Sequence, residues 1–140
     1  MALNLQHEFA YSEKPAIPVR LFVGQASVVT EALLDTGASV SLFDAELAAA
    51  LGLGWLSPQG RYGFDVIGVG GNVRRIPCLY VGLSVIGAPD DLTFTSLFIG
   101  FVPHLATSVG NLLGRNLFEM VDFGLHHHVL PSRRLYLGRV

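Results

Sequence analysis

A single acidic residue inside an apolar stretch raises the first chemical question. Residues 31–43 read EALLDTGASVSLF, so Asp35 follows Ala-Leu-Leu and precedes the small turn Thr-Gly-Ala-Ser. An isolated carboxylate that moves into an apolar setting loses its hydration and must find hydrogen-bond partners or a proton. The chemistry available at Asp35 is therefore that of a carboxylate that needs a partner.

An Asp-Thr-Gly triplet is also a common turn. Aspartate and glycine favour turns, and aspartate often accepts hydrogen bonds from the backbone N–H groups that follow it. A solvent-facing hairpin turn, however, does not need Leu33-Leu34 before it or Val40–Phe43 after it. Because apolar residues crowd both sides, we expect this turn to be buried.

Two further segments contain glycine next to apolar residues. Residues 111–119 read NLLGRNLFE and include Gly114, Arg115 and Asn116, while residues 65–73 read DVIGVGGNV. By itself, the second pattern is typical of an ordinary hairpin with a Gly-Asn turn.

Together, the three segments resemble the retropepsin-like aspartic proteases, the single-domain relatives of the pepsin family. LLDTGASVSLF is similar to the family's active-site loop. NLLGRNLFE is similar to the segment of retroviral proteases in which Gly-Arg-Asn or Gly-Arg-Asp starts the main helix, and DVIGVGGNV to the glycine-rich tip of the flap hairpin. Their order and spacing agree with the family and bracket residues 33–120.

The resemblance implies an enzyme that hydrolyses peptide bonds with two aspartates and a water held between them. One aspartate acts as general base and the other as general acid. Two carboxylates about 3 Å apart cannot both ionise, so they share a proton. The chain has one Asp-Thr-Gly, and Gly114-Arg115 stands where a fused two-lobed enzyme would repeat it. The expected enzyme is a C2 homodimer in which each chain contributes Asp35.

The resemblance also assigns roles to the residues after Asp35. Thr36 would form a hydrogen bond across the axis of the dimer. Gly37 would allow close backbone approach and direct its carbonyl toward the substrate. Ala38 and Ser39 would line the floor of the pocket.

The same resemblance makes the segment 67–71 part of a flap that closes over a bound peptide. The residues expected to touch substrate there are Ile67, Gly68, Val69, Gly70 and Gly71, with Val69 at the tip. Glycines lower the steric cost of turning and closing. The family's chemistry implies no metal and no cofactor.

Ser39 departs from the family pattern. Retroviral members often carry an acid four residues after the catalytic aspartate, where it pairs with the arginine of the Gly-Arg segment. Arg115 therefore needs another partner. About twenty residues follow the helix segment, Leu135–Leu137 among them, and we expect these residues to pair at the dimer interface.

The histidine run near the C-terminus raises the question of a metal. In a strand, alternate residues face opposite sides, so only His126 and His128 would share a face. The sequence implies no carboxylate or cysteine beside them. A solvated histidine run is therefore favoured over a metal site.

The remaining reactive side chains have simple structural interpretations. Cys78 lies in an apolar segment and is expected to be a small core residue. Asp90 and Asp91 follow Pro89, which predicts an exposed turn.

Composition indicates a folded domain without a nucleic-acid partner. Of the 140 residues, 51% are apolar and 14% charged, which favours one domain over residues 1–140. The net charge of -2 and the lack of long basic runs give no electrostatic reason to expect nucleic acid. The single cysteine excludes an internal disulfide framework.

The expected location is cytoplasmic. The N-terminus, MALNLQHEFAYSEK, has no charged segment followed by an apolar one, so we expect no signal peptide. No apolar run is long enough to span a bilayer. We attribute the high apolar content to a buried subunit interface. The alternative explanation is that the chain is a domain trimmed from a membrane-anchored parent protein.

Glycine and proline interrupt short segments rich in Val, Leu, Ile and Phe, which favours an all-β sandwich or barrel. With the resemblance, the expected fold is a single-domain, retropepsin-like closed β-barrel with one or two short helices and a β-hairpin flap. The predicted strands are Leu5–Tyr11, Val19–Val23, Ala26–Leu34, Val40–Phe43, Gly63–Ile67, Val73–Val81, Leu92–Phe98 and Arg134–Leu137.

Two segments have helical character. Residues 44–53 contain strong helix formers and a late glycine, which predicts one capped helix, and residues 115–120 predict another turn or two. Leu33–Gly37 and Leu112–Asn116 each combine an apolar pair, a glycine-bearing turn and a following helix. Either the two are halves of a duplicated unit or the similarity is chance.

The resulting hypothesis is an aspartic endopeptidase that acts as a homodimer on extended peptides. Cleavage is expected next to hydrophobic residues and at mildly acidic pH. The main alternative is a retropepsin-fold peptide-binding or dimerisation module with weak or lost proteolysis. A third hypothesis is a protease domain that cleaves only its own precursor.

Overall fold

The computed structural model describes residues 5–67, 71–88, 92–127 and 132–139. Its strands are β1 (His7–Tyr11), β2 (Ala16–Val23), β3 (Ala26–Leu34), β4 (Ser41–Asp44), β5 (Gly63–Ile67), β6 (Val73–Val85), β7 (Thr93–Val102), β8 (Asn111–Leu113), β9 (Val121–His126) and β10 (Arg133–Arg139). Its helices are α1 (Ala45–Ala50), the 3₁₀ helix η2 (Leu105–Thr107) and α2 (Arg115–Phe118). The predicted turn at Asp90 and Asp91 lies outside the described residues.

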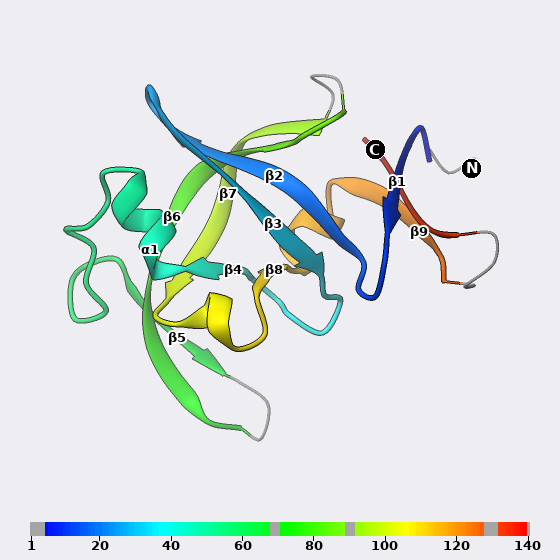
Figure 1. Cartoon of the computed structure of the whole chain (residues 1–140). Helices are drawn as coiled ribbons and strands as arrows, with labels where there is room; N and C mark the ends of the chain where they lie inside the picture. Colours follow the sequence, from blue (N-terminus) through cyan, green and yellow to red (C-terminus); the bar gives the residue numbers. More distant parts are fainter. Residues whose placement is uncertain (1–4, 68–70, 89–91, 128–131, 140) are drawn as a thin grey trace.

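Six strands close into a barrel (Figure 1). Their hydrogen-bonded order is β2-β3-β8-β4-β7-β6, and β6 pairs back onto β2, with Val85 opposite Val19. β5 extends the sheet beyond β6 as the outer strand of a hairpin. Closure pairs the backbone groups that an open edge would leave exposed. The predicted all-β barrel with two short α-helices is confirmed.

Alternate residues along the barrel strands fill its interior. In β2, Ile17, Val19 and Leu21 are fully buried, while Pro18 and Arg20 between them are exposed. This period of two places one face of the strand in the core. Each large apolar side chain removed from water in this way contributes about 1.5–3 kcal/mol to folding.

A separate three-stranded sheet packs beside the barrel, with the order β1-β10-β9. β10 is its central strand, and Leu135 and Leu137 point into the core and are fully buried. For residues 135–137, the expectation of pairing at the dimer interface is therefore wrong. Both hydrogen-bonding edges of β10 are taken by strands of its own chain.

Helix α1 forms inside the predicted segment 44–53. The Oδ1 atom of Asp44 accepts a hydrogen bond from the N–H of Glu46 at 2.9 Å and caps the first turn. Gly52, just beyond the C-terminal end, has a φ of +77°, a left-handed conformation that glycine adopts without strain. The predicted capped helix is confirmed, and α2 likewise forms within residues 115–120.

The two similar segments of the sequence lie side by side in space. β3 and β8 pair in parallel, with Leu33 opposite Leu112 and Leu34 opposite Leu113. β8 leads through Gly114 directly into α2, whereas β3 is followed by the Asp35 loop and β4 before α1 begins. The similarity therefore corresponds to two equivalent positions in the barrel.

Several predicted strands are shorter than the observed ones, and two strands were not predicted. β8 and β9 were not predicted, and β6 and β7 extend several residues beyond Val81 and Phe98. Gly82 lies within β6, where a Cβ atom would come 2.1 Å from the ring of Phe22. Glycine is present there because of close packing, and the ladder shifts register beside it.

Candidate functional site

Asp35 lies where the parallel pair β3–β8 ends. Its backbone N–H donates to the carbonyl of Leu113 at 2.9 Å, which continues the ladder one residue beyond β3. Its Oδ1 atom accepts from the N–H of Gly37 at 2.9 Å, and its carbonyl accepts from the N–H of Ala38 at 3.2 Å. The carboxylate is thus held over its own turn, as the Asp-Thr-Gly pattern predicts.

Gly37 packs closely on the carboxylate that it binds. A Cβ atom at residue 37 would lie 3.1 Å from Oδ1 of Asp35. A larger residue would crowd the oxygen that accepts the hydrogen bond of its own N–H. The glycine therefore helps to fix the orientation of the carboxylate.

The loop around Asp35 is open to solvent, so the expectation of a buried turn is wrong for the single chain. Its exposed residues are Thr36, Gly37 and Ser39, and its partly buried ones are Asp35, Ala38 and Val40. Only the flanking residues enter the core, as Leu34 and Phe43 do. β3 ends at the rim of the barrel, and the chain passes outside the barrel before it returns as β4 (Figure 1).

The predicted segment 114–116 braces this loop. The backbone N–H of Arg115 donates to the carbonyl of Ala38 at 2.7 Å. A Cβ atom on Gly114 would lie 2.6 Å from the carbonyl oxygen of Val40. Only glycine lets the two backbones approach so closely, which explains its place in the sequence.

Arg115 forms a hydrogen bond to the same loop. Its Nη1 atom donates to the carbonyl oxygen of Thr36 at 3.2 Å. The sequence has Ser39 where retroviral proteases often carry an acid, so Arg115 was expected to need another partner. Within the described residues, no carboxylate pairs with Arg115. The hydroxyl of Thr36 makes no hydrogen bond to the described part of this single chain, so its predicted role across a dimer axis stays a prediction.

Asn116 and Ser41 connect the helix to β4 and β7. Oδ1 of Asn116 accepts from the N–H and the hydroxyl of Ser41 at 3.1 and 2.9 Å, and its Nδ2 donates to the carbonyl of Phe98 at 2.8 Å. Ser41 was not among the predicted site residues. The signal in the sequence was a hydroxyl residue inside the otherwise apolar strand 40–43.

The hairpin β5–β6 carries the predicted substrate-touching residue Ile67. Ile67 pairs with Val73 at the last described position before the tip, and the two are 71% and 63% exposed. Gly71 has a φ of +82°, which its lack of a side chain permits. The predicted contacts at Gly68, Val69 and Gly70 lie outside the described residues. Figure 1 shows the hairpin reaching away from the barrel on the side where the β3–β4 loop lies.

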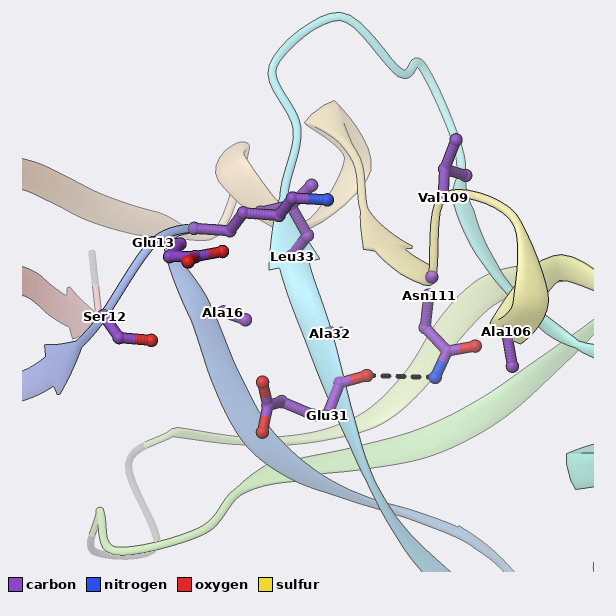
Figure 2. Close-up of a pocket in the computed structure, with 11 residues that line it drawn as sticks. Ser12, Glu13, Ala16, Glu31, Ala32, Leu33, Ala106, Val109 and Asn111 are labelled. Atoms are coloured by element: carbon purple, nitrogen blue, oxygen red, sulfur yellow. Dashed lines mark hydrogen bonds between the residues drawn. The ribbon is translucent and has the colours of Figure 1, made fainter.

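A cavity of about 390 Å³ opens beside the end of β3 (Figure 2). It lies between the β1–β2 connection, β3 and the loop after η2. Its lining residues are Ser12, Glu13, Lys14, Ala16, Glu31, Ala32, Leu33, Ala106, Val109, Gly110 and Asn111. None of these was predicted as a site residue. The available signal was that Glu31 shares the outer face of its strand with Leu33, two residues before Asp35.

Asn111 and Asp44 anchor one wall of this cavity. Asn111 donates from Nδ2 to the carbonyl of Glu31 at 2.9 Å (dashed in Figure 2) and accepts at Oδ1 from the N–H of Asp44 at 2.9 Å. Oδ2 of Asp44 accepts from the N–H of Ala106 at 2.8 Å. These buried polar groups hold the loop 103–110 against β3 and β4.

Asp44 is ionised more readily than an ordinary aspartate. Burial would raise its pKa, but hydrogen bonds from the N–H groups of Ala106 and Glu46 and the nearby His104 outweigh that effect. The pKa of Asp44 is therefore lower than its usual value.

The other reactive side chains form no catalytic group in the described structure. Cys78 is buried and free, and burial raises the pKa of its thiol to about 11, which suppresses the nucleophilic thiolate. His127 bonds through Nδ1 to the hydroxyl of Tyr11 at 2.7 Å and stacks on its ring. Within the described residues, no three His, Cys, Asp or Glu side chains are grouped to hold a metal. His128 lies outside those residues.

No protein-family model matches the chain, and no curated protein matches it significantly. Of the helices in the described ranges, none combines the length and apolar character that crossing a membrane requires.

Proposed function

We propose that this protein is an aspartic endopeptidase that acts as a homodimer and cleaves peptide bonds next to hydrophobic residues. The observation that carries the proposal is the setting of Asp35. Its Oδ1 atom is bound by the N–H of Gly37, while Oδ2 has no partner among the described residues and would hold the water. The segment 114–116 fixes the backbone of the loop that presents it.

Two copies of Asp35 would complete the reaction. One carboxylate takes a proton from the bound water as its oxygen attacks the carbonyl carbon of the substrate. The other carboxyl group, protonated at the start, first donates to the carbonyl oxygen. The tetrahedral intermediate then collapses and the C–N bond breaks: the leaving nitrogen takes the proton that the first carboxylate received from the water, and a hydroxyl of the intermediate returns its proton to the second carboxylate. The shared proton of the pair accounts for the expected preference for mildly acidic pH.

The exposed loop supports assembly into a dimer, because a surface that presents Asp35 outward needs a second copy to cover it. Among the described strands, β9 pairs only with β10, and we place the contact at its other edge. Phe123 and Leu125 lie on the same face as the buried Leu137 and Leu135 opposite them, yet Leu125 is 49% exposed. An edge strand with exposed apolar residues is suited to pairing with another strand.

Apolar side chains at the base of the hairpin support the choice of substrate. Ile76, Val102 and Leu105 belong to a small buried cluster, and the partly buried Leu42 and Val66 pack against it. Residues of this kind between the loop and the hairpin favour apolar side chains of an extended peptide.

The replacement of Asp35 by asparagine tests the proposal. Digestion of a peptide library should give cleavage next to hydrophobic residues with the wild-type protein and with Glu46→Gln, a control on the surface of α1. Asp35→Asn should show no cleavage but the same thermal unfolding and the same molar mass in solution. A pepstatin-class inhibitor should bind the wild-type protein and not Asp35→Asn.

Cleavage that persists in Asp35→Asn would overturn the mechanism. If the wild-type protein binds peptides but cleaves none of them, the alternative of a binding module replaces the enzyme.

A further inference from the structure

The cavity beside β3 has an apolar floor and an acidic side. Leu33, Ala16 and Val109 supply apolar surface, and Val109 is 54% exposed. Glu13 and Glu31 contribute carboxylates from two neighbouring segments, and Figure 2 shows both side chains on the same side of the space. A groove of this kind matches a long side chain that is apolar along its stem and polar at its end.

The two carboxylates have no cationic partner of their own. Lys14 also lines the cavity, but no ion pair joins it to Glu13 or Glu31 in the described part of the chain, where the pairs seen are Arg75–Asp65 and Arg134–Glu8. Two acids and one base leave the cavity with a formal charge of -1.

The polar group nearest to Glu31 is already engaged. The Nδ2 atom of Asn111 donates to the carbonyl of Glu31 and to Oγ1 of Thr30. It is therefore not available to the Glu31 carboxylate. That carboxylate is free to bind a donor that enters the cavity.

We infer that this cavity is a specificity subsite for a lysine or arginine side chain of the peptide substrate. The aliphatic stem packs on Leu33 and Val109, and the cationic end meets Glu31 and Glu13. The inference rests on the proposed function, since it identifies the substrate of the same Asp35 site. The proposed enzyme prefers hydrophobic residues at the scissile bond. The subsite would add a second requirement, a basic residue near that bond.

The position of the cavity along β3 sets the distance from the bond that is cut. Leu33 precedes Asp35 by two residues, which corresponds to about 7 Å along a strand. An extended peptide advances by about 3.3 Å per residue, so the basic side chain belongs about two or three residues from the scissile bond. A C2 dimer would present one such cavity on each side of that bond.

Charge distinguishes this occupant from the others that the cavity could hold. An acidic side chain would meet two carboxylates of like charge. A purely apolar side chain would cover Leu33 but would also take water from a carboxylate without replacing it. A basic side chain satisfies both halves of the cavity.

Matched peptides test the inference by kinetics. Peptides that share an apolar pair at the scissile bond would carry lysine or its neutral analogue norleucine at each position within three residues of the bond. For the wild-type protein, kcat/KM should be about fivefold higher for the best lysine peptide than for its norleucine match, the factor of a partly exposed ion pair. The Glu31→Gln protein should lose this ratio, and Glu46→Gln should keep it. Equal cleavage of both peptides, or a ratio that survives in Glu31→Gln, would overturn the inference.

Direct binding separates this inference from the proposed function. The uncleaved lysine peptide, labelled with a fluorophore, is titrated with the Asp35→Asn protein and with the Asp35→Asn/Glu31→Gln protein. The subsite is supported if the lysine peptide, but not its norleucine match, binds more weakly to Asp35→Asn/Glu31→Gln than to Asp35→Asn. This result would hold even if no peptide is cleaved. If cleavage occurs but binding does not depend on Glu31, the subsite is rejected and the enzyme stands.

Discussion

Ser41 and Asn116 hold each other through two hydrogen bonds, from the N–H and the hydroxyl of Ser41 to one oxygen of Asn116. The same hydroxyl accepts from the N–H of Gly114 at 3.0 Å. Ser41 is fully buried. One side chain therefore links β4 to the segment that braces the Asp35 loop.

Replacement of Ser41 by alanine should destabilise the protein. The change leaves the buried N–H of Gly114 without its acceptor, which costs about 1–3 kcal/mol. Chemical denaturation should show this loss of unfolding free energy. Ser27→Ala, at an exposed serine of β3, should stay within about 0.5 kcal/mol of wild type. Equal stability of the two variants would show that the Ser41 hydroxyl does not brace the loop.

Replacement of Gly114 by alanine should displace the Asp35 loop. Its Cβ atom would lie 2.6–2.8 Å from backbone atoms of Val40 and Ala38, which cannot move without moving the loop. Overpacking of this kind costs about 1–3 kcal/mol. Thermal unfolding should reveal the loss, and peptide cleavage should fall further than the loss of folded protein explains.

Gly54→Ala provides the matched control for Gly114→Ala. A Cβ atom at Gly54 meets nothing within 4 Å. That variant should unfold within about 1 kcal/mol of wild type. If Gly114→Ala behaves as Gly54→Ala does, the close backbone approach is not needed.

The sequence predicts the barrel because the residue patterns that favour strands and helices involve only neighbouring residues. The apolar composition of β2 and the helix capped at Asp44 are properties of neighbouring residues; the helix formed as expected, and β2 formed but begins at Ala16 rather than at Val19. The three-residue strand β8 is too short for a period, and the pairing of β10 inside its own chain is set by β1, more than a hundred residues away. Contacts of that range leave no mark on local sequence.

The sequence likewise predicted part of the candidate site but not all of it. Asp35, Gly114 and Arg115 stand in recognisable segments, and the structure brings them into one loop and its brace. The cavity could not be predicted, because Glu13 and Glu31 lie on segments that meet only when β2 and β3 pair. The exposure of the Asp35 turn was missed because apolar flanks do not determine on which side of the barrel rim a loop passes.

The stability of the protein should depend on the charge of Asp44. Because the pKa of Asp44 is lowered in the folded state, its contribution is fully present above the unfolded value and is lost as pH falls through the folded value. Asp44→Asn keeps one acceptor oxygen for two N–H donors, so it should cost about 1–2 kcal/mol at pH 7. Urea denaturation from pH 7 down to pH 3 should show the difference from wild type shrinking at the acidic end. Glu46→Gln should show no such convergence, and a difference for Asp44→Asn that is independent of pH would contradict the assignment.

The edge of β9 should determine whether the protein forms a dimer. Leu125 is half exposed on the face that continues the core, and a lysine there would place a charge in the proposed contact. Two lysines facing each other across a twofold axis repel, and each also loses hydration. Analytical ultracentrifugation should show Leu125→Lys as a monomer at concentrations where the wild-type protein is a dimer.

The same variant links assembly to catalysis. Val29→Lys, at a residue of β3 that is 55% exposed, is the matched control and should remain dimeric and active. Leu125→Lys should retain its thermal stability as a folded chain but lose peptide cleavage, since a monomer has one Asp35. Activity should return as the concentration of Leu125→Lys is raised to the point where dimers form again. A monomeric variant that cleaves as fast as wild type would rule out a carboxylate pair shared between two chains.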